Sequence, residues 1–257
     1  MCHYASPAGQ PPAHAVCEEV AIPLPGGERL PALLARPEQG EGPPVLVVSD
    51  IFGRSPFYED LAARLAEQGY TALLPDYFFR LETLPERNLA LAYARRNRLD
   101  EHRVLRELST ALDWLGERVG KPAGRMGTIG FCLGGTLVLD LAAARADLAT
   151  VCYYGFPAAA EDDTALAAPP PLGLTDRMHG PILGFWGDQD VAVGMPNVER
   201  LAAALHERGV AYRHTIYPGV GHAFLAATPN DADPAPYQAA RDAWKNTLAF
   251  YATHLRA

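Results

Sequence analysis

The sequence predicts an α/β fold in which a mostly parallel central sheet is covered by helices on both faces. Short apolar segments alternate with helical patterns from residue 45 onward, which is typical of strands joined by helical crossovers. Several of these segments, such as residues 45–48, are wholly apolar, as strands buried on both faces are. The chain of 257 residues, 49% of them hydrophobic, is also long enough to enclose one substantial core.

The N-terminal part of the chain differs from the rest. Residues 1–15, rich in Pro and Ala, are expected to form a flexible arm, followed by a single domain of residues 16–257. Segments 16–22 and 30–35 flank a Pro-Gly-Gly turn sequence, which predicts an N-terminal antiparallel hairpin ahead of the parallel part of the sheet.

Helix signals follow the first buried strand. Ser55 can cap a helix and Pro56 suits its first position, while Gly69 is expected to end it. Further strands are expected at residues 70–74, 126–131, 150–154, 182–186 and 212–217, further helices at 89–98, 104–119, 133–146, 198–208 and 235–255, and a long loop within 155–180. Because ligands bind beyond the carboxyl ends of parallel strands, the loops after these strands are the places to search for chemistry.

Charge and composition exclude several classes of partner. The net charge is -8, from 22 basic and 30 acidic side chains, so no basic stripe is available for nucleic acid or an anionic membrane. The first residues lack the basic start and apolar run of a signal peptide, and no apolar run approaches about 20 residues. We therefore expect a cytoplasmic protein. The four cysteines show no CxxC spacing and are expected to be free thiols.

One of these cysteines lies in a sequence that is typical of a catalytic turn. Residues 130–135 read Gly-Phe-Cys-Leu-Gly-Gly, the pattern of a nucleophile elbow with Cys132 in place of serine. The thiol would sit at the N-terminus of a helix, where the dipole and unpaired N–H groups favour a thiolate. The Leu133 N–H would point at a developing oxyanion. The alternative is a buried thiol in a tight strand-to-helix turn.

A carboxylate and a histidine follow two later strands. Asp190 is preferred over Asp188 as the acid, because the triad acid follows its strand by a few residues, whereas Asp188 suits a turn or a cap. His222 stands in a glycine-rich loop after the strand at 212–217. The order nucleophile, acid, histidine is that of α/β-hydrolases, so three loops at strand ends predict a Cys132–Asp190–His222 triad on that fold.

With these residues identified, the sequence resembles the dienelactone hydrolase family, the cysteine-nucleophile branch of the α/β-hydrolases. The resemblance runs from about residue 16 to the C-terminus and is carried by residues 50–53 (DIFG), 75–80 (PDYFFR), 130–135 (GFCLGG), 189–193 (QDVAV), 221–224 (GHAF) and 243–248 (AWKNTL). It implies hydrolysis of small lactones or esters of the carboxymethylenebutenolide type through the same triad. It also implies no metal and no organic cofactor.

Two departures from the family pattern concern charged side chains. Where the family carries a glutamate that interacts with the resting thiol, this chain has Asp50, which is one methylene shorter. Of the two arginines that hold the substrate carboxylate in the family, Arg80 matches one, and residues 225–227 (Leu-Ala-Ala) supply no second. Arg80 is expected to pair with a carboxylate of the substrate, and the alternative is an exposed loop arginine.

The expected site is completed by backbone groups and aromatic side chains. The N–H groups of Leu133 and Ile51 would form the oxyanion hole, because the second donor in this fold comes from the loop after an earlier strand. Phe52, Tyr154 and Phe224 are expected to contact the substrate. We expect a small-molecule lactone or ester as the binding partner, neither nucleic acid nor membrane, and either a monomer or a small homo-oligomer.

Two other functions stay open at this stage. The first is a broader carboxylesterase or thioesterase with the same triad, which the absence of the second arginine favours. The second is a non-catalytic binding protein on the same fold. All three triad positions are filled, and a binding module has no need of that set, so we expect an enzyme.

Overall fold

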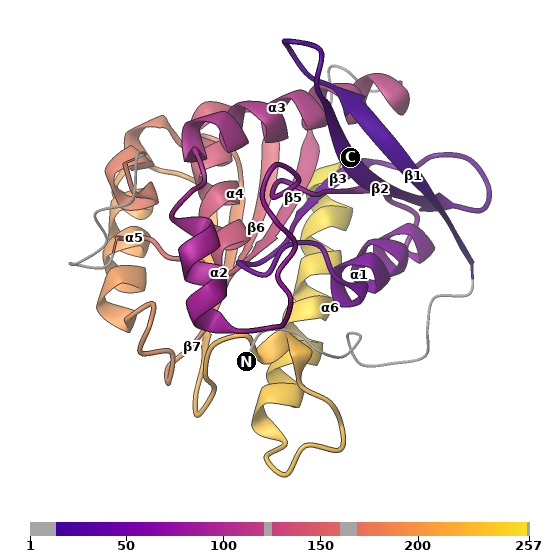
Figure 1. Ribbon diagram of the computed structural model, residues 1–257. Helices are drawn as coiled ribbons and strands as arrows, with labels where there is room; N and C mark the ends of the chain where they lie inside the picture. Colours follow the sequence, from indigo (N-terminus) through magenta and orange to yellow (C-terminus); the bar gives the residue numbers. More distant parts are fainter. Residues whose placement is uncertain (1–13, 121–124, 160–168, 256–257) are drawn as a thin grey trace.

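A central sheet organises the computed structural model, which describes residues 14–120, 125–159 and 169–255 (Figure 1). Among these residues, eight strands form one sheet in the order β1-β2-β4-β3-β5-β6-β7-β8. The strands are β1 (Ala15–Pro23), β2 (Arg29–Pro37), β3 (Pro44–Val48), β4 (Thr71–Pro75), β5 (Met126–Phe131), β6 (Leu148–Tyr153), β7 (Ile182–Gly187) and β8 (Tyr212–Tyr217).

The pairing of the strands confirms the predicted fold class. From β4 to β8 every neighbouring pair is parallel, whereas β1 pairs with β2, and β2 with β4, in antiparallel fashion. The predicted hairpin is therefore the edge of the sheet. All residues of β3, β4, β5, β6 and β7 are buried, which is why these strands read as continuous apolar segments rather than as alternating ones.

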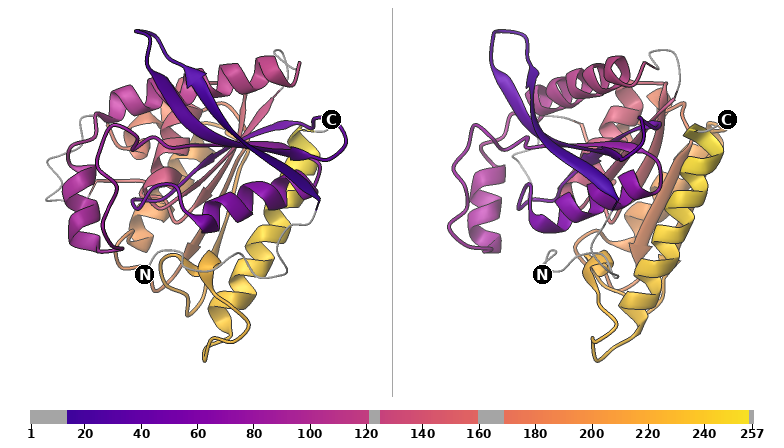
Figure 2. Two further views of the ribbon diagram at one scale, coloured as in Figure 1. Left: turned by 45° about the vertical axis from the view of Figure 1, so that its right-hand side comes forward. Right: turned by 90° about the vertical axis from the view of Figure 1, so that its right-hand side faces the viewer.

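Helices cover both faces of the sheet. In Figure 2, α6 runs along one face and α3 and α4 lie on the opposite face, so the sheet is enclosed between two helical layers. Contacts of α4 with β3, β5 and β6, and of α6 with β5, β6 and β7, join these layers to the sheet. The helices are α1 (Pro56–Glu67), α2 (Leu89–Arg96), α3 (Glu101–Arg118), α4 (Leu133–Ala144), α5 (Met195–Glu207), α6 (Ala235–Leu255) and the short η1 (Pro171–Arg177) and η2 (Phe224–Ala226).

Several predicted boundaries differ from the structure. Ser55 occupies the N-cap position of α1, as expected, but its side chain makes no capping hydrogen bond. The predicted position was therefore right and the predicted hydrogen bond was wrong. Helix α3 begins at Glu101 because Asp100 caps it, accepting a hydrogen bond from the Arg103 N–H at 2.9 Å. The segment expected to be a loop contains η1. The N-terminal arm falls mostly on residues 1–13, which lie outside the described residues, and β1 begins at Ala15.

No helix in the described part of the chain has the length and apolar character needed to cross a bilayer.

The parallel arrangement brings together four loops that carry expected site residues, each at the carboxyl end of its strand. Asp50 and Ile51 follow β3, Cys132 follows β5, and the loops after β7 and β8 carry Asp190 and His222. The carboxyl ends of parallel strands lie at one edge of a sheet, so residues far apart in sequence meet there.

Close contact between α4 and the sheet fixes the turn after β5. A Cβ on Gly130 would lie 2.0 Å from the Gly134 carbonyl oxygen, and a Cβ on Gly134 would lie 2.2 Å from the Val48 carbonyl oxygen. Real side chains do not approach backbone oxygens so closely, so only glycine fits either position. The first turn of α4 is thereby pressed against the ends of β3 and β5.

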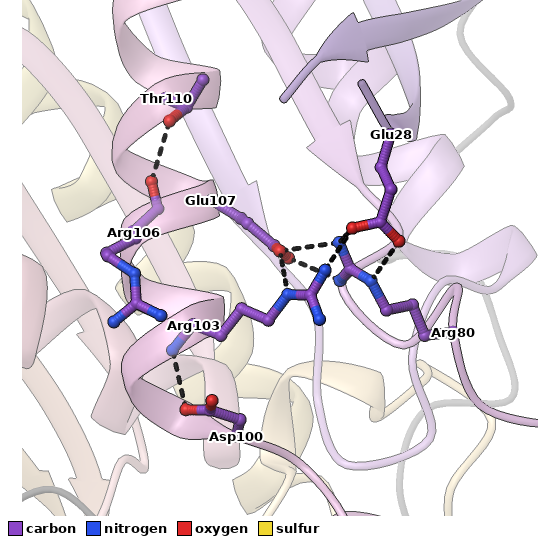
Figure 3. A network of polar contacts seen from close by, with 7 residues as sticks. All are labelled: Glu28, Arg80, Asp100, Arg103, Arg106, Glu107 and Thr110. Carbon is purple, nitrogen blue, oxygen red and sulfur yellow. Dashed lines mark hydrogen bonds and ion pairs between the residues drawn. The ribbon is translucent and has the colours of Figure 1, made fainter. Parts of the chain in front are cut away.

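A polar network ties the hairpin to α3 (Figure 3). The Arg80 guanidinium donates to both carboxylate oxygens of Glu28 at 2.9 Å and to Glu107 at 3.0 Å. Arg103 bridges the same two acids and donates to Glu107 at 2.9 Å. Glu28 lies between β1 and β2, so this network connects the sheet edge to a helix.

Replacing Gly130 with Ala should lower the free energy of unfolding by roughly 3 kcal/mol, because the added methyl group has no room and the backbone must shift. Chemical denaturation monitored by circular dichroism measures the change. Gly173→Ala is the matched control, since a Cβ there meets nothing closer than 4.0 Å, and it should stay within about 0.5 kcal/mol of wild type. Equal effects of the two substitutions would contradict the close contact.

Replacing Arg80 with Gln should destabilise the fold by roughly 1 kcal/mol, because Glu107 is nearly buried and loses one of its two cationic partners. The ratio of activities on an anionic and a neutral ester should stay as in wild type, because the guanidinium is occupied by Glu28 and Glu107. Both quantities can be measured on one preparation. A selective loss of activity on the anionic ester, with stability unchanged, would assign Arg80 to substrate binding instead.

Candidate active site

Cys132 occupies a strained turn between β5 and α4. Its φ of 55° and ψ of -118° lie in a region that side chains other than glycine rarely adopt, and such strain accumulates at functional sites. The Cys132 N–H donates to the Tyr153 carbonyl at 3.1 Å, which fixes the turn against β6. Cys132 is the N-cap of α4, and Leu133 is the first helical residue, whose N–H has no acceptor within the helix.

A histidine and a carboxylate meet in the loops at the same edge of the sheet. The Nδ1 atom of His222 lies 2.7 Å from Oδ2 of Asp190, and the Asp190 side chain is buried. The other carboxylate oxygen of Asp190 accepts the Val193 N–H at 3.2 Å, so both oxygens have fixed partners. An anchored carboxylate of this kind holds an imidazole in one orientation and favours the tautomer with a proton on Nδ1, leaving Nε2 as a base.

The neighbouring Asp188 has another role. Its Oδ1 accepts the N–H of Gly219 at 2.7 Å, and the Gln189 N–H donates to the Val220 carbonyl at 2.9 Å. These bonds join the loop after β7 to the loop that carries His222. The structure therefore places Asp190 against His222 and Asp188 in a contact between two loops, while the choice of Asp190 as the catalytic acid stays a prediction.

Two side chains from other segments hydrogen-bond to backbone carbonyl groups of the loop after β3. The Tyr77 hydroxyl lies 2.9 Å and 2.8 Å from the carbonyl oxygens of Ser49 and Asp50, and Arg95 donates to the Ile51 carbonyl at 3.0 Å. Burial raises the pKa of Tyr77 well above its usual value, and the negative charges of Asp50 and Cys132 raise it further. Tyr77 therefore remains a neutral donor close to the candidate nucleophile.

Asp50 is fully buried within this loop. Its Oδ1 accepts the Phe52 N–H at 2.8 Å, and its Oδ2 lies 3.8 Å from an Arg87 nitrogen. Burial raises the pKa of Asp50, while the Phe52 N–H and the Arg87 charge oppose the rise. Arg87 also lies over the Phe52 ring at 4.3 Å. No local pattern reveals the Arg87 contact, because Asp50 and Arg87 lie far apart along the chain.

A cavity of about 300 Å³ opens on Cys132. Three residues expected at the site line it, namely Cys132, Leu133 and Ile51, and apolar groups such as Phe156 and Pro170 form much of its wall. Its polar lining includes Thr136, Asp140, Arg96 and Glu101. Asp140 was not singled out from the sequence, since it appears there as one polar residue within an otherwise apolar helix.

The other expected substrate contacts lie outside the lining of this cavity. Tyr154 and Phe224 are buried and pack on each other at 5.4 Å, and the Tyr154 ring lies 4.9 Å from the His222 ring. They therefore support the histidine. Phe52 lines a separate pocket, and Arg80 is engaged by Glu28 and Glu107.

Across the described residues, no group of three or more His, Cys, Asp or Glu side chains is arranged to hold a metal ion.

Comparison with known proteins places this geometry in a family. The model of the dienelactone hydrolase family matches residues 30–255. The carboxymethylenebutenolidase of Rhodococcus opacus is 34% identical over 257 residues, covering 99% of this chain and 98% of the relative. A crystal structure from Klebsiella pneumoniae subsp. pneumoniae MGH 78578 is 29% identical with a TM-score of 0.82, covering 93% of this chain and 99% of that one.

A further structural neighbour agrees in fold. The crystal structure of dienelactone hydrolase from Anabaena variabilis has a TM-score of 0.66 at 23% identity and covers 95% of this chain and 100% of that one. The family resemblance and the α/β-hydrolase fold expected from the sequence are thus confirmed. The chain belongs to the dienelactone hydrolase family and is a hydrolase.

Proposed function

We propose that this protein hydrolyses small lactones and esters, including the enol-lactone carboxymethylenebutenolide, with Cys132 as nucleophile, His222 as base and Asp190 as the residue that orients the base. The observation that carries the proposal is the position of Cys132 in a strained turn that opens on a cavity. The hydrogen-bonded pair Asp190 and His222 lies at the same edge of the sheet, where the parallel strands end. The name of the Rhodococcus opacus relative, a carboxymethylenebutenolidase, supports this choice of substrate.

The proposed reaction begins with the thiol. His222 takes the proton of Cys132, and the thiolate sulfur attacks the carbonyl carbon of the lactone or ester. The C–O bond then breaks, the leaving oxygen departs as an enolate or alkoxide and takes up a proton, and the acyl group remains on sulfur as a thioester. His222 next removes a proton from water, which attacks the thioester, releases the carboxylic acid and restores the thiol.

Backbone N–H groups would stabilise the oxyanion. The Leu133 N–H stands at the first position of α4, where the helix dipole also favours negative charge. The Asp50 carbonyl accepts from Tyr77, and a trans peptide directs the following N–H to the opposite side, so the Ile51 N–H points away from Tyr77. Ile51 and Leu133 both line the cavity. Tyr77 thus acts in this proposal as a positioning residue for the second donor.

Asp50 would modulate the thiol in this scheme. Its carboxyl lies close enough to His222 for the two charges to interact, and burial favours the neutral form of the acid. A negative charge on Asp50 opposes the thiolate, and the rise that burial produces in the pKa of Asp50 weakens this opposition.

A second candidate function is a broader esterase or thioesterase with the same triad. Two observations favour it: Arg80 is occupied by Glu28 and Glu107, and residues 225–227 supply no arginine. Neutral esters would then be turned over at least as well as carboxylate-bearing lactones. In either case the partner is a small molecule, and the cytoplasmic location and the monomeric or small oligomeric state expected from the sequence remain predictions.

The test uses carboxymethylenebutenolide and p-nitrophenyl acetate with wild type and two variants. Cys132→Ala should lose measurable turnover of both substrates. Asp190→Asn should lower kcat by a factor of about 10² to 10⁴, because the amide disfavours the required tautomer of His222. Steady-state kinetics measures both. The ratio of the kcat/KM values of wild type for the two substrates decides between the lactonase and the broader esterase.

Two matched controls make this test specific. Cys152→Ala removes a second buried thiol, whose pKa burial raises to about 12, and should keep activity. Asp188→Asn changes the neighbouring acid, which does not contact His222, and should stay within a factor of about three of wild type. Retained hydrolysis by Cys132→Ala, or equal losses in the two aspartate variants, would refute the assigned roles.

A further inference from the structure

The cavity that opens on Cys132 extends along one face of α4. Cys132, Thr136 and Asp140 all line it and are spaced four residues apart, which places them on the same side of a helix. The rise of a helix puts the Asp140 backbone about 12 Å from that of Cys132. The far end of the cavity is therefore built around a carboxyl group that the proposed mechanism does not use.

Asp140 is buried without a full set of partners. The residue is 5% exposed, and its Oδ1 makes no hydrogen bond with any described group. A buried polar atom without a partner is destabilising, so native proteins rarely contain one without a reason. Asp140 also lines the cavity, so a molecule bound there can hydrogen-bond with its carboxyl group.

Charged neighbours of Asp140 are already paired with each other. Arg96, the last residue of α2, donates to Glu101, the first residue of α3, at 3.2 Å, and both line the same cavity. Arg96 is thus held by Glu101, and the charges at this end of the cavity balance without Asp140.

The environment favours a neutral carboxyl at this position. Burial raises the pKa of Asp140 well above its usual value, and the negative charge of Glu101 raises it further. A neutral carboxyl offers one O–H donor together with acceptor oxygens, as in the sites where a buried acid serves as a hydrogen-bond donor.

We propose that Asp140 is a specificity-determining residue whose carboxyl group hydrogen-bonds an uncharged polar group, such as a ketone or an ether, carried by the substrate at the end remote from the bond that is cleaved. The proposal rests on the proposed function, since it assigns the substrate class of the same cavity.

The surroundings explain why the group should be uncharged. Phe156, Ala158, Pro169 and Pro170 make the wall of the cavity largely apolar, and Arg96 is neutralised by Glu101. A carboxylate brought to this end would lose its hydration without meeting an unpaired cation among the described residues that line the cavity, and Glu101 would repel it. A ketone loses little hydration and regains a hydrogen bond from Asp140.

The test compares matched esters that differ only at the remote end. One pair is p-nitrophenyl octanoate and the same ester with a ketone at the penultimate carbon. The second pair consists of acetate esters in which the alcohol carries the same two chains. Their hydrolysis releases acid and is followed with a pH indicator. Each kcat/KM is divided by that of the same enzyme on phenyl acetate, which carries no hydrogen-bonding group at its remote end.

Wild type should prefer the ketone in at least one pair by about tenfold, the value of one hydrogen bond of roughly 1.4 kcal/mol. Asp140→Leu, which branches at the same carbon but cannot hydrogen-bond, should abolish the preference through a rise in KM for the ketone. Asp140→Asn, which keeps donor and acceptor atoms, should retain it. A carboxylate in place of the ketone should be disfavoured by wild type.

Two outcomes would overturn the inference while leaving the catalytic assignment intact. One is a wild-type enzyme that turns over p-nitrophenyl acetate through Cys132 yet shows no preference in either pair. The other is a preference that Asp140→Leu preserves. The wild-type comparison decides the matter even if the leucine variant does not fold. Failure of the proposed function would show differently, as p-nitrophenyl acetate hydrolysis that survives Cys132→Ala.

Discussion

The contact between the first turn of α4 and the ends of β3 and β5 is the constraint on which the rest of the site depends. Gly130 and Gly134 allow backbone atoms to meet where any side chain would clash. That contact forces Cys132 into its strained conformation and brings Leu133 level with the loop after β3. The thiol, the two candidate oxyanion donors and the cavity wall are therefore positioned by backbone packing rather than by flexible side chains.

Three buried aspartates, Asp190, Asp50 and Asp140, lie in the described part of this region, and their surroundings give them different tasks. Asp190 has both oxygens bonded, one to a backbone N–H and one to His222, which suits an anion that orients a base. Asp50 receives one backbone N–H and faces Arg87 across 3.8 Å. Asp140 has an oxygen without a partner and lines the cavity. Fewer internal hydrogen bonds leave a buried acid more readily protonated and more available to a ligand.

Much of the fold could be predicted because its strands are buried on both faces. Segments such as residues 45–48 are apolar throughout, and the glycine-flanked Cys132 follows one of them. The preference for Asp190 over Asp188 also followed from position, since a residue beside the last strand position belongs to the turn and a later one can reach the histidine. These signals are local, and local patterns determine local structure.

The remaining features depend on contacts between distant segments. The occupation of Arg80 by Glu28 and Glu107 requires the hairpin and α3 to meet, which no spacing in the sequence reveals. The contacts of Arg87 with Asp50 and of Tyr77 with the Ser49 carbonyl also join residues that lie far apart along the chain. Asp140 gave no signal because α4 is buried on nearly all sides, so its polar residue marks no exposed face.

The most direct measurement of the central claim is the identity of the acylated side chain during turnover. Wild type mixed with a p-nitrophenyl ester, quenched with acid during the pre-steady-state phase and digested, should carry the acyl group on the peptide that contains Cys132. The peptide that contains Cys152 should be unmodified, and Cys132→Ala should form no adduct. An acyl group on another residue, or an adduct that still forms in Cys132→Ala, would contradict the account.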